Sequence, residues 1–302
     1  MNSRRRVNSD VGFSLELCMF QIPFRWDLTH RNHLGSLVDA ERAESYAAFL
    51  DHLLPCCSRV LAFGGDFDLI FVGRSPESIF DHLSGLLFDS SWFSRLELLH
   101  FSMRFREEAD VHQEHPESIN AMRAYLQHLG LQPEGIATRI RPIAFIDLVA
   151  TGDTFGRLVT FFRNWSKEIE YDWNAVKRRI RLIGITEKTK TSPKTWRWQQ
   201  QASWLSRLES RSVKNVSIPR ELWEYLGNYQ YKVSRSYTPS RWGDPELSLP
   251  SYSESQLKAL RLAYELFELG RTKERRERFV SLLVKEPAMK HEWFRMLVQE
   301  IR

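Results

Sequence analysis

Short apolar runs alternate with amphipathic stretches along the first two thirds of the chain. Ile143 to Val149 is apolar apart from Asp147, whereas from Phe155 onward the apolar positions recur three and four residues apart. The first pattern is typical of a strand buried on both faces, and the second of a helix packed on a sheet. Because the alternation recurs along the chain, the sequence predicts an α/β domain with a parallel sheet.

Periodicity indicates further elements on both sides of this pair. Strand-like composition marks 15–24, 58–63, 68–72, 96–105 and 180–186, and helical spacing marks 39–54, 77–87, 119–131, 219–226, 257–270, 272–284 and 290–301. Ser75 is expected to cap the helix at 77–87. We expect an N-terminal arm at 1–37, and within 191–302 a lid segment, a linker at 227–252 and a mainly helical C-terminal extension.

Two of the predicted strands end in turns of small residues that lead directly into a helix. These turns are Gly73-Arg74-Ser75 and Thr151-Gly152-Asp153-Thr154. The unpaired backbone N–H groups of a first helical turn, together with the helix dipole, favour an anion at such a place. Arg74 can pair bidentately with phosphate, and the hydroxyls of Thr151 and Thr154 can donate to it. The alternative is that both are ordinary turns of an α/β domain.

The second turn and its strand resemble a known family. The stretch Ile146-Asp147-Leu148-Val149-Ala150-Thr151-Gly152-Asp153-Thr154 is similar to the phosphoribosyl-pyrophosphate (PRPP) motif of type I phosphoribosyltransferases. In that motif two acids, two apolar residues and a Thr-Gly turn follow a strand. The chain departs from it at Ile146, which stands where the first acid is expected and so removes a ligand to the ribose.

The resemblance implies a Rossmann-like parallel sheet of the type I phosphoribosyltransferase kind over residues 38–190, with a PRPP site at the ends of two strands. The loop around the 5′-phosphate would be Thr151, Gly152, Asp153 and Thr154, and the loop around pyrophosphate would be Gly73, Arg74 and Ser75. Asp147 would be the catalytic acid beside the ribose hydroxyls. Mg²⁺ would enter bound to PRPP, so no residue is assigned as a direct metal ligand, and the acceptor site is not identified. In the family a flexible loop precedes the PRPP strand, and here His100, Arg104 and Arg106 lie near the start of that gap.

Two functions follow from the resemblance. The first is a phosphoribosyltransferase that moves the phosphoribosyl group of PRPP to a nucleobase-like acceptor and releases pyrophosphate. The second is a catalytically inactive protein of the same fold that binds PRPP, a nucleotide or RNA as a sensor or interaction module. Ile146 favours the second, as does the basic segment around Trp196, Trp198 and Trp204, whose rings either stack bases or anchor a helix. If both turns are only structural, the protein is a plain α/β interaction protein.

Composition limits the class of protein. Of 302 residues 42% are apolar, and 43 basic against 38 acidic side chains leave a net charge of +5. These values are those of a soluble globular protein, and the mild positive charge permits a phosphate-bearing ligand or nucleic acid without requiring either. No apolar run approaches the ~18 residues of a spanning helix, and the polar N-terminus is unlike a secretory signal, so we expect no membrane association and a cytoplasmic location. Cys18, Cys56 and Cys57 are interpreted as reduced thiols.

One other polar segment carries candidate chemistry. Residues 27–33 form a loop with two histidines, His30 and His33. They are either a metal-binding or catalytic pair, or part of a solvated loop, and the sequence shows no third ligand beside them.

Overall fold

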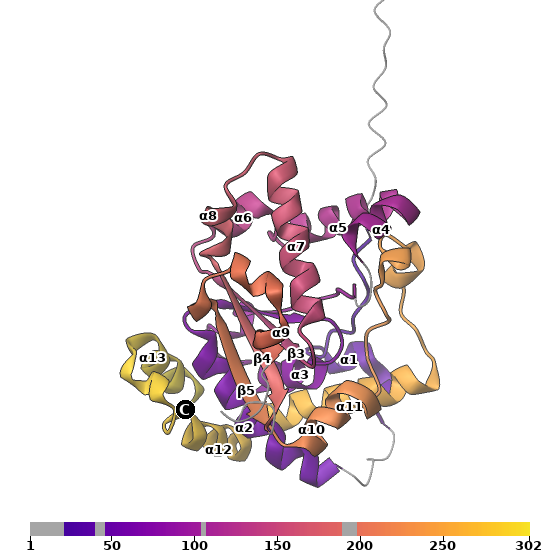
Figure 1. Ribbon diagram of the computed structural model, residues 1–302. Coiled ribbons are helices and arrows are strands. Elements are labelled where there is room, and N and C mark those ends of the chain that lie inside the picture. Colours follow the sequence, from indigo (N-terminus) through magenta and orange to yellow (C-terminus); the bar gives the residue numbers. More distant parts are fainter. Residues whose placement is uncertain (1–20, 40–45, 104–106, 189–197) are drawn as a thin grey trace, which may run out of the picture.

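The protein is built around one parallel β-sheet (Figure 1). A computed structural model describes residues 21–39, 46–103, 107–188 and 198–302. The strands among them are β1 (Asp68–Val72), β2 (Leu96–Leu99), β3 (Ile143–Leu148), β4 (Ile180–Glu187) and β5 (Val213–Ile218). All strand pairs are parallel, and the order across the sheet is β2-β1-β3-β4-β5. The predicted α/β fold with a Rossmann-like parallel sheet is therefore confirmed, in one of the two common doubly wound orders.

Successive residues of the central strands enter two apolar cores, one on each face of the sheet. In β3, Ala144 and Ile146 join one core, while Ile143 and Phe145 join the other. Because side chains alternate along a strand, a strand buried on both faces is apolar at nearly every position. The same alternation directs Ile146 and Asp147 to opposite faces of the sheet, and Ile146 is fully buried in the first core.

Helices cover both faces of the sheet (Figure 1). One face carries α2 (Tyr46–Gly64), α3 (Glu77–Leu86), α10 (Arg220–Glu224), α11 (Glu254–Arg271), α12 (Lys273–Leu283) and α13 (Glu292–Ile301). The other carries α4 (Glu108–Glu114), α5 (Pro116–His128), α6 (Pro133–Thr138), α7 (Asp153–Glu168), α8 (Trp173–Lys177) and α9 (Trp198–Gln201), and the short α1 (Arg31–Leu34) packs beside α11. None of the described helices is both long and apolar enough to cross a bilayer.

Helix α2 departs most from the sequence prediction. It runs through 19 residues and includes Pro55, expected to end a helix, and residues 58–63, expected to form a strand. Leu53, Cys57 and Leu61, spaced four residues apart, are fully buried in the core. Burial of this helical stripe against the sheet outweighs the backbone hydrogen bond that proline cannot make.

Other differences concern the ends of elements. The strand predicted at 96–105 ends at Leu99. Residues 21–37 of the predicted arm are described, and Leu28 and Leu34 among them are buried against α11. Strand β5 was not predicted and adds residues beyond 190 to the sheet. Its sequence, Val-Lys-Asn-Val-Ser-Ile, mixes buried, half-exposed and exposed positions because it forms the edge of the sheet. Such a strand lacks the continuous apolar run that marked the central ones.

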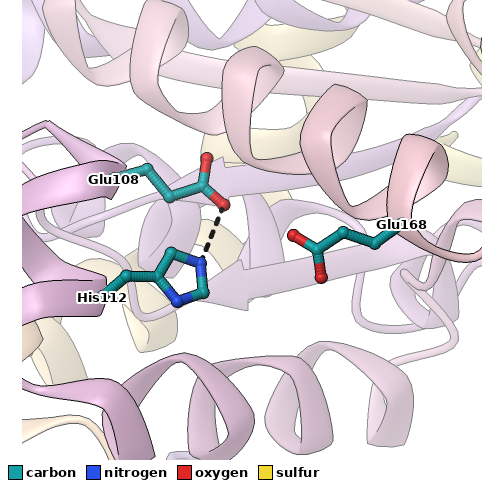
Figure 2. Close-up of side chains that lie close together, drawn as sticks. All are labelled: Glu108, His112 and Glu168. Carbon is teal, nitrogen blue, oxygen red and sulfur yellow. Dashed lines mark ion pairs between the residues drawn. The ribbon is translucent and has the colours of Figure 1, made fainter.

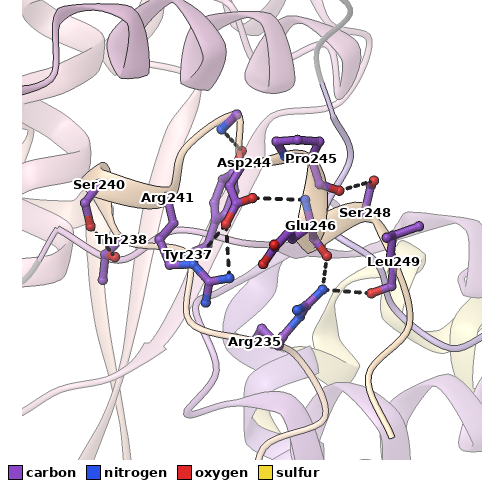
Figure 3. Close-up of polar contacts among 11 residues, drawn as sticks. Arg235, Tyr237, Thr238, Ser240, Arg241, Asp244, Pro245, Glu246, Ser248 and Leu249 are labelled. Atoms are coloured by element: carbon purple, nitrogen blue, oxygen red, sulfur yellow. Dashed lines mark hydrogen bonds and ion pairs between the residues drawn. The ribbon is translucent and has the colours of Figure 1, made fainter.

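We call residues 227–252 the strap, and Figure 3 shows the polar contacts among its residues between Arg235 and Leu249. Within it Arg235 donates to the carbonyl of Leu249 at 2.9 Å. The strap is joined to the chain after β2, because the N–H of Ser102 donates to the carbonyl of Tyr237 at 3.1 Å. The segment expected to be a linker is therefore packed on the core, beside the carboxyl ends of the strands.

Candidate functional site

A cavity of about 360 Å³ lies at the carboxyl ends of β1, β2 and β3. It is lined by residues 72–75, 100–102 and 147–155 and by side chains of the strap and of α10. The strand order reverses between β1 and β3, and ligands of doubly wound sheets bind in the crevice at this switch point. All the residues that the sequence analysis proposed for phosphate and ribose lie around this one cavity.

The turn between β3 and α7 presents a helix amino terminus to the cavity. Gly152 precedes α7 with a φ of +88°, and a Cβ at this position would lie 2.5 Å from the ring of Trp198. Only glycine meets both conditions. No described side chain caps the first turn of α7, and Thr151 and Thr154 line the cavity beside it. The backbone N–H groups of this turn are therefore available to an anion.

Asp153 places a negative charge in the same turn. Its carboxylate accepts a hydrogen bond of 2.7 Å from the hydroxyl of Thr151, and both residues line the cavity. A phosphate entering this turn would compete with the carboxylate for the hydroxyl, since both are acceptors. The turn thus combines backbone N–H groups that can bind an anion with a carboxylate, Asp153, that would repel one.

The turn after β1 contributes Gly73, Arg74 and Ser75 to the cavity. Gly73 has a φ of +72°, and its N–H donates to the carbonyl of Leu99 at 2.8 Å. This bond joins the ends of β1 and β2. Arg74 lines the same cavity as the turn at the amino terminus of α7.

Ser75 does not cap the following helix, contrary to prediction. Helix α3 begins at Glu77, with Pro76 at the N-cap position and no side-chain cap. Glu77 is 1% exposed, and its carboxylate accepts hydrogen bonds from the backbone N–H groups of Val233 at 2.9 Å and Ser234 at 3.1 Å. The start of α3 is thus determined by a buried contact with the strap, which local sequence cannot reveal.

A buried ion pair network supports this contact. Arg25 lies 3.4 Å from a carboxylate oxygen of Glu77, pairs with Asp81, and donates to the hydroxyl of Ser234 at 3.2 Å. Burial raises the pKa of Asp81 to about 6, although the charge of Arg25 opposes this shift. The network ties the N-terminal segment, α3 and the strap together next to the cavity.

Asp147 is a buried carboxylate of the cavity, with 6% of its surface exposed. It accepts a hydrogen bond of 2.7 Å from the N–H of Leu148. Burial raises the pKa of Asp147 to about 7, against the lowering effects of that N–H, the Thr154 side chain and the charge of Lys232. A carboxyl group in this range can exchange a proton near neutral pH, and a cationic ligand would stabilise its charged form.

Lys232 is a cation of the cavity that the sequence analysis missed. It belongs to the strap and donates to the carbonyl of Leu226 at 2.5 Å. Burial lowers the pKa of Lys232 to about 8, and the charge of Arg74 acts in the same direction. Other residues missed at the cavity are Trp223, Asn228, Arg235 and Tyr237. Nothing in the sequence around Lys232, which is rich in Tyr and Ser, indicates that this lysine lies at a cavity. Its position depends on how the strap folds back over the sheet.

His100 also lines the cavity, as the sequence analysis considered. Burial, with a smaller contribution from the charge of Arg25, lowers the pKa of His100 to about 3, so its ring is neutral at physiological pH. Its backbone N–H donates to the hydroxyl of Tyr125 at 3.2 Å. Arg104 and Arg106, considered with it, lie outside the described residues.

The described tryptophans of the basic segment anchor α7. The indole N–H of Trp198 donates to Asn215 at 2.8 Å, and its ring, 6% exposed, stacks on that of Trp204 with centroids 6.1 Å apart. A Cβ added at Gly156 of α7 would lie 2.7 Å from Trp204. Both rings are thus engaged in packing, while Trp196 lies outside the described residues.

The loop with two histidines, at 27–33, agrees with the second of its two interpretations, a solvated loop. The rings of His30 and His33 stack with centroids 5.1 Å apart, and Asp27 lies 2.7 Å from His30. All three side chains are largely exposed, and among the described residues they do not converge as a group of metal ligands.

Comparisons with protein-family models, with curated proteins and with solved structures found no match for this chain. The resemblance at 146–154 is therefore carried by its own pattern and by the geometry around it. That geometry includes three basic side chains, Arg74, Lys232 and Arg235, and two acidic ones, Asp147 and Asp153, around one cavity.

Proposed function

We propose that the cavity binds a phosphorylated ribose of the PRPP kind. The observation that carries this proposal is that the two turns, separated by about half the domain in sequence, meet at one cavity at the switch point of the sheet. The α7 amino terminus would receive the 5′-phosphate through its N–H groups and the hydroxyls of Thr151 and Thr154. Arg74 and the turn after β1 would receive pyrophosphate through charge-assisted hydrogen bonds.

Size and charge agree with such a ligand. The cavity of about 360 Å³ falls within the range of roughly 300–1,000 Å³ typical of small-molecule sites. Its polar lining is chiefly donor groups and cations, which suit a ligand with several phosphate oxygens. Asp147, which lines the same cavity, would accept a hydrogen bond from a ribose hydroxyl.

We further propose that the bound ligand is used for transfer of its phosphoribosyl group to a nucleobase-like acceptor. Arg74 and Lys232 would stabilise the charge that develops on the departing pyrophosphate. Asp147 would orient a ribose hydroxyl or a water molecule bound to Mg²⁺, and its raised pKa agrees with a carboxylate whose charge needs a further cation nearby. Bound Mg²⁺ supplies neutralisation of the leaving group's charge.

Ile146 favours a second candidate function, a protein of the same fold that binds the phosphorylated ribose but does not catalyse a reaction. Its side chain is fully buried among apolar residues on the face opposite to Asp147. Asp147 is therefore without the neighbouring acid that the family motif places beside the ribose. Such a protein would respond to PRPP or a nucleotide through the strap, whose residues form one wall of the cavity.

Calorimetric titration of PRPP, with and without Mg²⁺, tests the shared part of both candidates. We expect one site per chain, and Arg74→Ala should lower the affinity by about tenfold or more, since a hydrogen bond to a charged group is worth about 1.5–3 kcal/mol. Arg163→Ala, an exposed arginine of α7 that does not line the cavity, is the matched control. Absence of heat with PRPP, ribose 5-phosphate and nucleoside monophosphates would refute the proposal.

Pyrophosphate release separates the candidates. Incubation with PRPP, Mg²⁺ and a panel of nucleobases should release pyrophosphate from the wild type and much less from Asp147→Asn. Binding that is retained while no base gives release would leave the sensor as the function.

A further inference from the structure

Three side chains with metal-binding atoms converge away from the cavity (Figure 2). Glu108 and His112 lie one turn apart on α4, and Glu168 is the last residue of α7. One ligand atom from each lies within 4.8 Å of the other two. Residues four apart on a helix present their side chains to the same face, so α4 supplies two of the three from one surface.

Glu108 is the buried member of this group and has a carboxylate oxygen without a partner. Its side chain is 6% exposed, and one oxygen, Oε2, accepts a hydrogen bond of 2.7 Å from Asn164. The other, Oε1, is buried and has no hydrogen-bond partner among the described residues. The nearest basic group to it is the Nε2 atom of His112 at 3.9 Å, beyond hydrogen-bond distance. A buried carboxylate oxygen in this state is costly unless a cation compensates it.

We propose that Glu108, His112 and Glu168 bind a divalent transition-metal ion, with Zn²⁺ as the first candidate. Zn²⁺ accepts one imidazole and two carboxylates as ligands, and Co²⁺ and Mn²⁺ accept similar donors. Ligand atoms around Zn²⁺ lie about 3.4 Å apart, given bonds of about 2.1 Å. His112 and Glu168, whose side chains are 44% and 46% exposed, can move to close the difference while Glu108 stays in place.

Arg123 and Asn164 complete the surroundings of the three ligands. The guanidinium of Arg123 lies 2.7 Å from Oε2 of Glu168 and over the ring of Trp165. A carboxylate has two oxygens, so Glu168 can keep Arg123 on one and give the other to the ion. In Glu108, likewise, Oε2 accepts from Asn164 and Oε1 remains for the ion. Hydrogen-bond partners of this kind fix the orientation of metal ligands.

The position of this group indicates a structural role. Helix α7 has 16 residues, so its last residue lies roughly 24 Å from the cavity at its first. An ion would join the carboxyl end of α7 to α4. The inference is therefore independent of the proposed function at the cavity.

Titration of Zn²⁺ into the chelator-treated full chain at pH 7.5 tests the proposal. We expect one ion per chain, and a loss of affinity of at least tenfold in His112→Ala and in Glu168→Gln. His115→Ala, which removes a neighbouring histidine outside the group, and His30→Ala, in the exposed histidine loop, should bind as the wild type does. Both ligand variants change exposed side chains, so the fold is retained and a difference reports on the site.

Co²⁺ provides a second measurement. Its visible absorption should show the intense bands of a low-symmetry protein site in the wild type and lose them in His112→Ala. Zn²⁺ binding that is absent, or that is unchanged in both ligand variants, would overturn the proposal and leave the group as an ion-pair cluster.

Discussion

The two turns that border the cavity are built alike and used differently. Each follows a parallel strand, contains a glycine with positive φ (Gly73 or Gly152) and leads into a helix without a side-chain cap. The first turn of α3 carries Glu77, which is buried and bonded to the strap. The first turn of α7 carries Asp153. Among the described residues, its carboxylate accepts a side-chain hydrogen bond from Thr151, a neighbour in the same turn.

The difference shows how burial decides the role of an acid at a helix start. A carboxylate favours the positive end of the helix dipole in either case. When it is buried and bonded to another segment, its loss breaks tertiary structure, whereas at a cavity wall it mainly changes what the cavity attracts. The turn after β1 therefore holds the strap, and the turn after β3 borders the cavity without a side-chain cap on its helix.

Removal of Glu77 should cause the largest loss of stability. Glu77→Ala leaves two buried strap N–H groups unpaired and takes a carboxylate from Arg25, which should lower the free energy of unfolding by about 3 kcal/mol. Glu117→Ala, an exposed acid in the first turn of α5, should cost less than about 0.5 kcal/mol. Urea denaturation measures both. Equal losses would mean that the two acids act only through their helix dipoles.

Gly152→Ala tests the geometry of the other turn. The positive φ and the close approach of Trp198 should together cost about 2 kcal/mol of unfolding free energy. Gly130→Ala has a φ of +65° and meets only the far end of the Arg139 side chain, 3.2 Å from the added Cβ, and should show chiefly the backbone part, about 1 kcal/mol. Thermal unfolding of the two variants compares them, and indistinguishable shifts would contradict a steric role for Trp198.

Asp147→Asn should change the pH dependence of stability. The folded protein holds a proton on Asp147 up to a pH of about 7, whereas the unfolded chain loses it near 3.8. The unfolding free energy of the wild type therefore falls as the pH rises between these values. The variant lacks this loss and should be more stable than the wild type by about 4 kcal/mol at pH 8, with the difference becoming small near pH 4. Parallel stability curves from pH 4 to 8 would disprove the shift.

Asp153→Asn should have the smallest effect on stability and act on the ligand instead. Loss of the negative charge beside Thr151 should raise the affinity for inorganic phosphate by about three- to tenfold, with an effect that shrinks in high salt. Asp172→Asn, at the N-cap of α8 and away from the cavity, is the control. Titration at two ionic strengths measures both, and a lower affinity in Asp153→Asn would place the anion elsewhere.

The sequence predicted the elements whose burial is visible in one stretch of chain. The central strands at 68–72, 143–149 and 180–186 were recognised because both of their faces are buried, which makes every position informative. The fifth strand was not recognised, because an edge strand shows a broken apolar pattern. The 58–63 segment of α2 was assigned wrongly, because a short apolar run fits a strand or a helix equally. The two turns of the cavity were identified for the same reason as the central strands, since each follows a strand of unambiguous pattern.

The sequence by itself thus determined the parallel sheet, the two glycine turns and the single acid, Asp147, at the end of β3. Only the tertiary structure decided which residues meet across the chain. Lys232 reaches the cavity because Glu77 and Arg25 hold the strap, and Glu168 reaches Glu108 because α7 lies beside α4. Periodicity reports whether a side chain faces water or core, a property of one segment. Which polar groups become neighbours depends on the packing of segments far apart in sequence, and no local pattern records it.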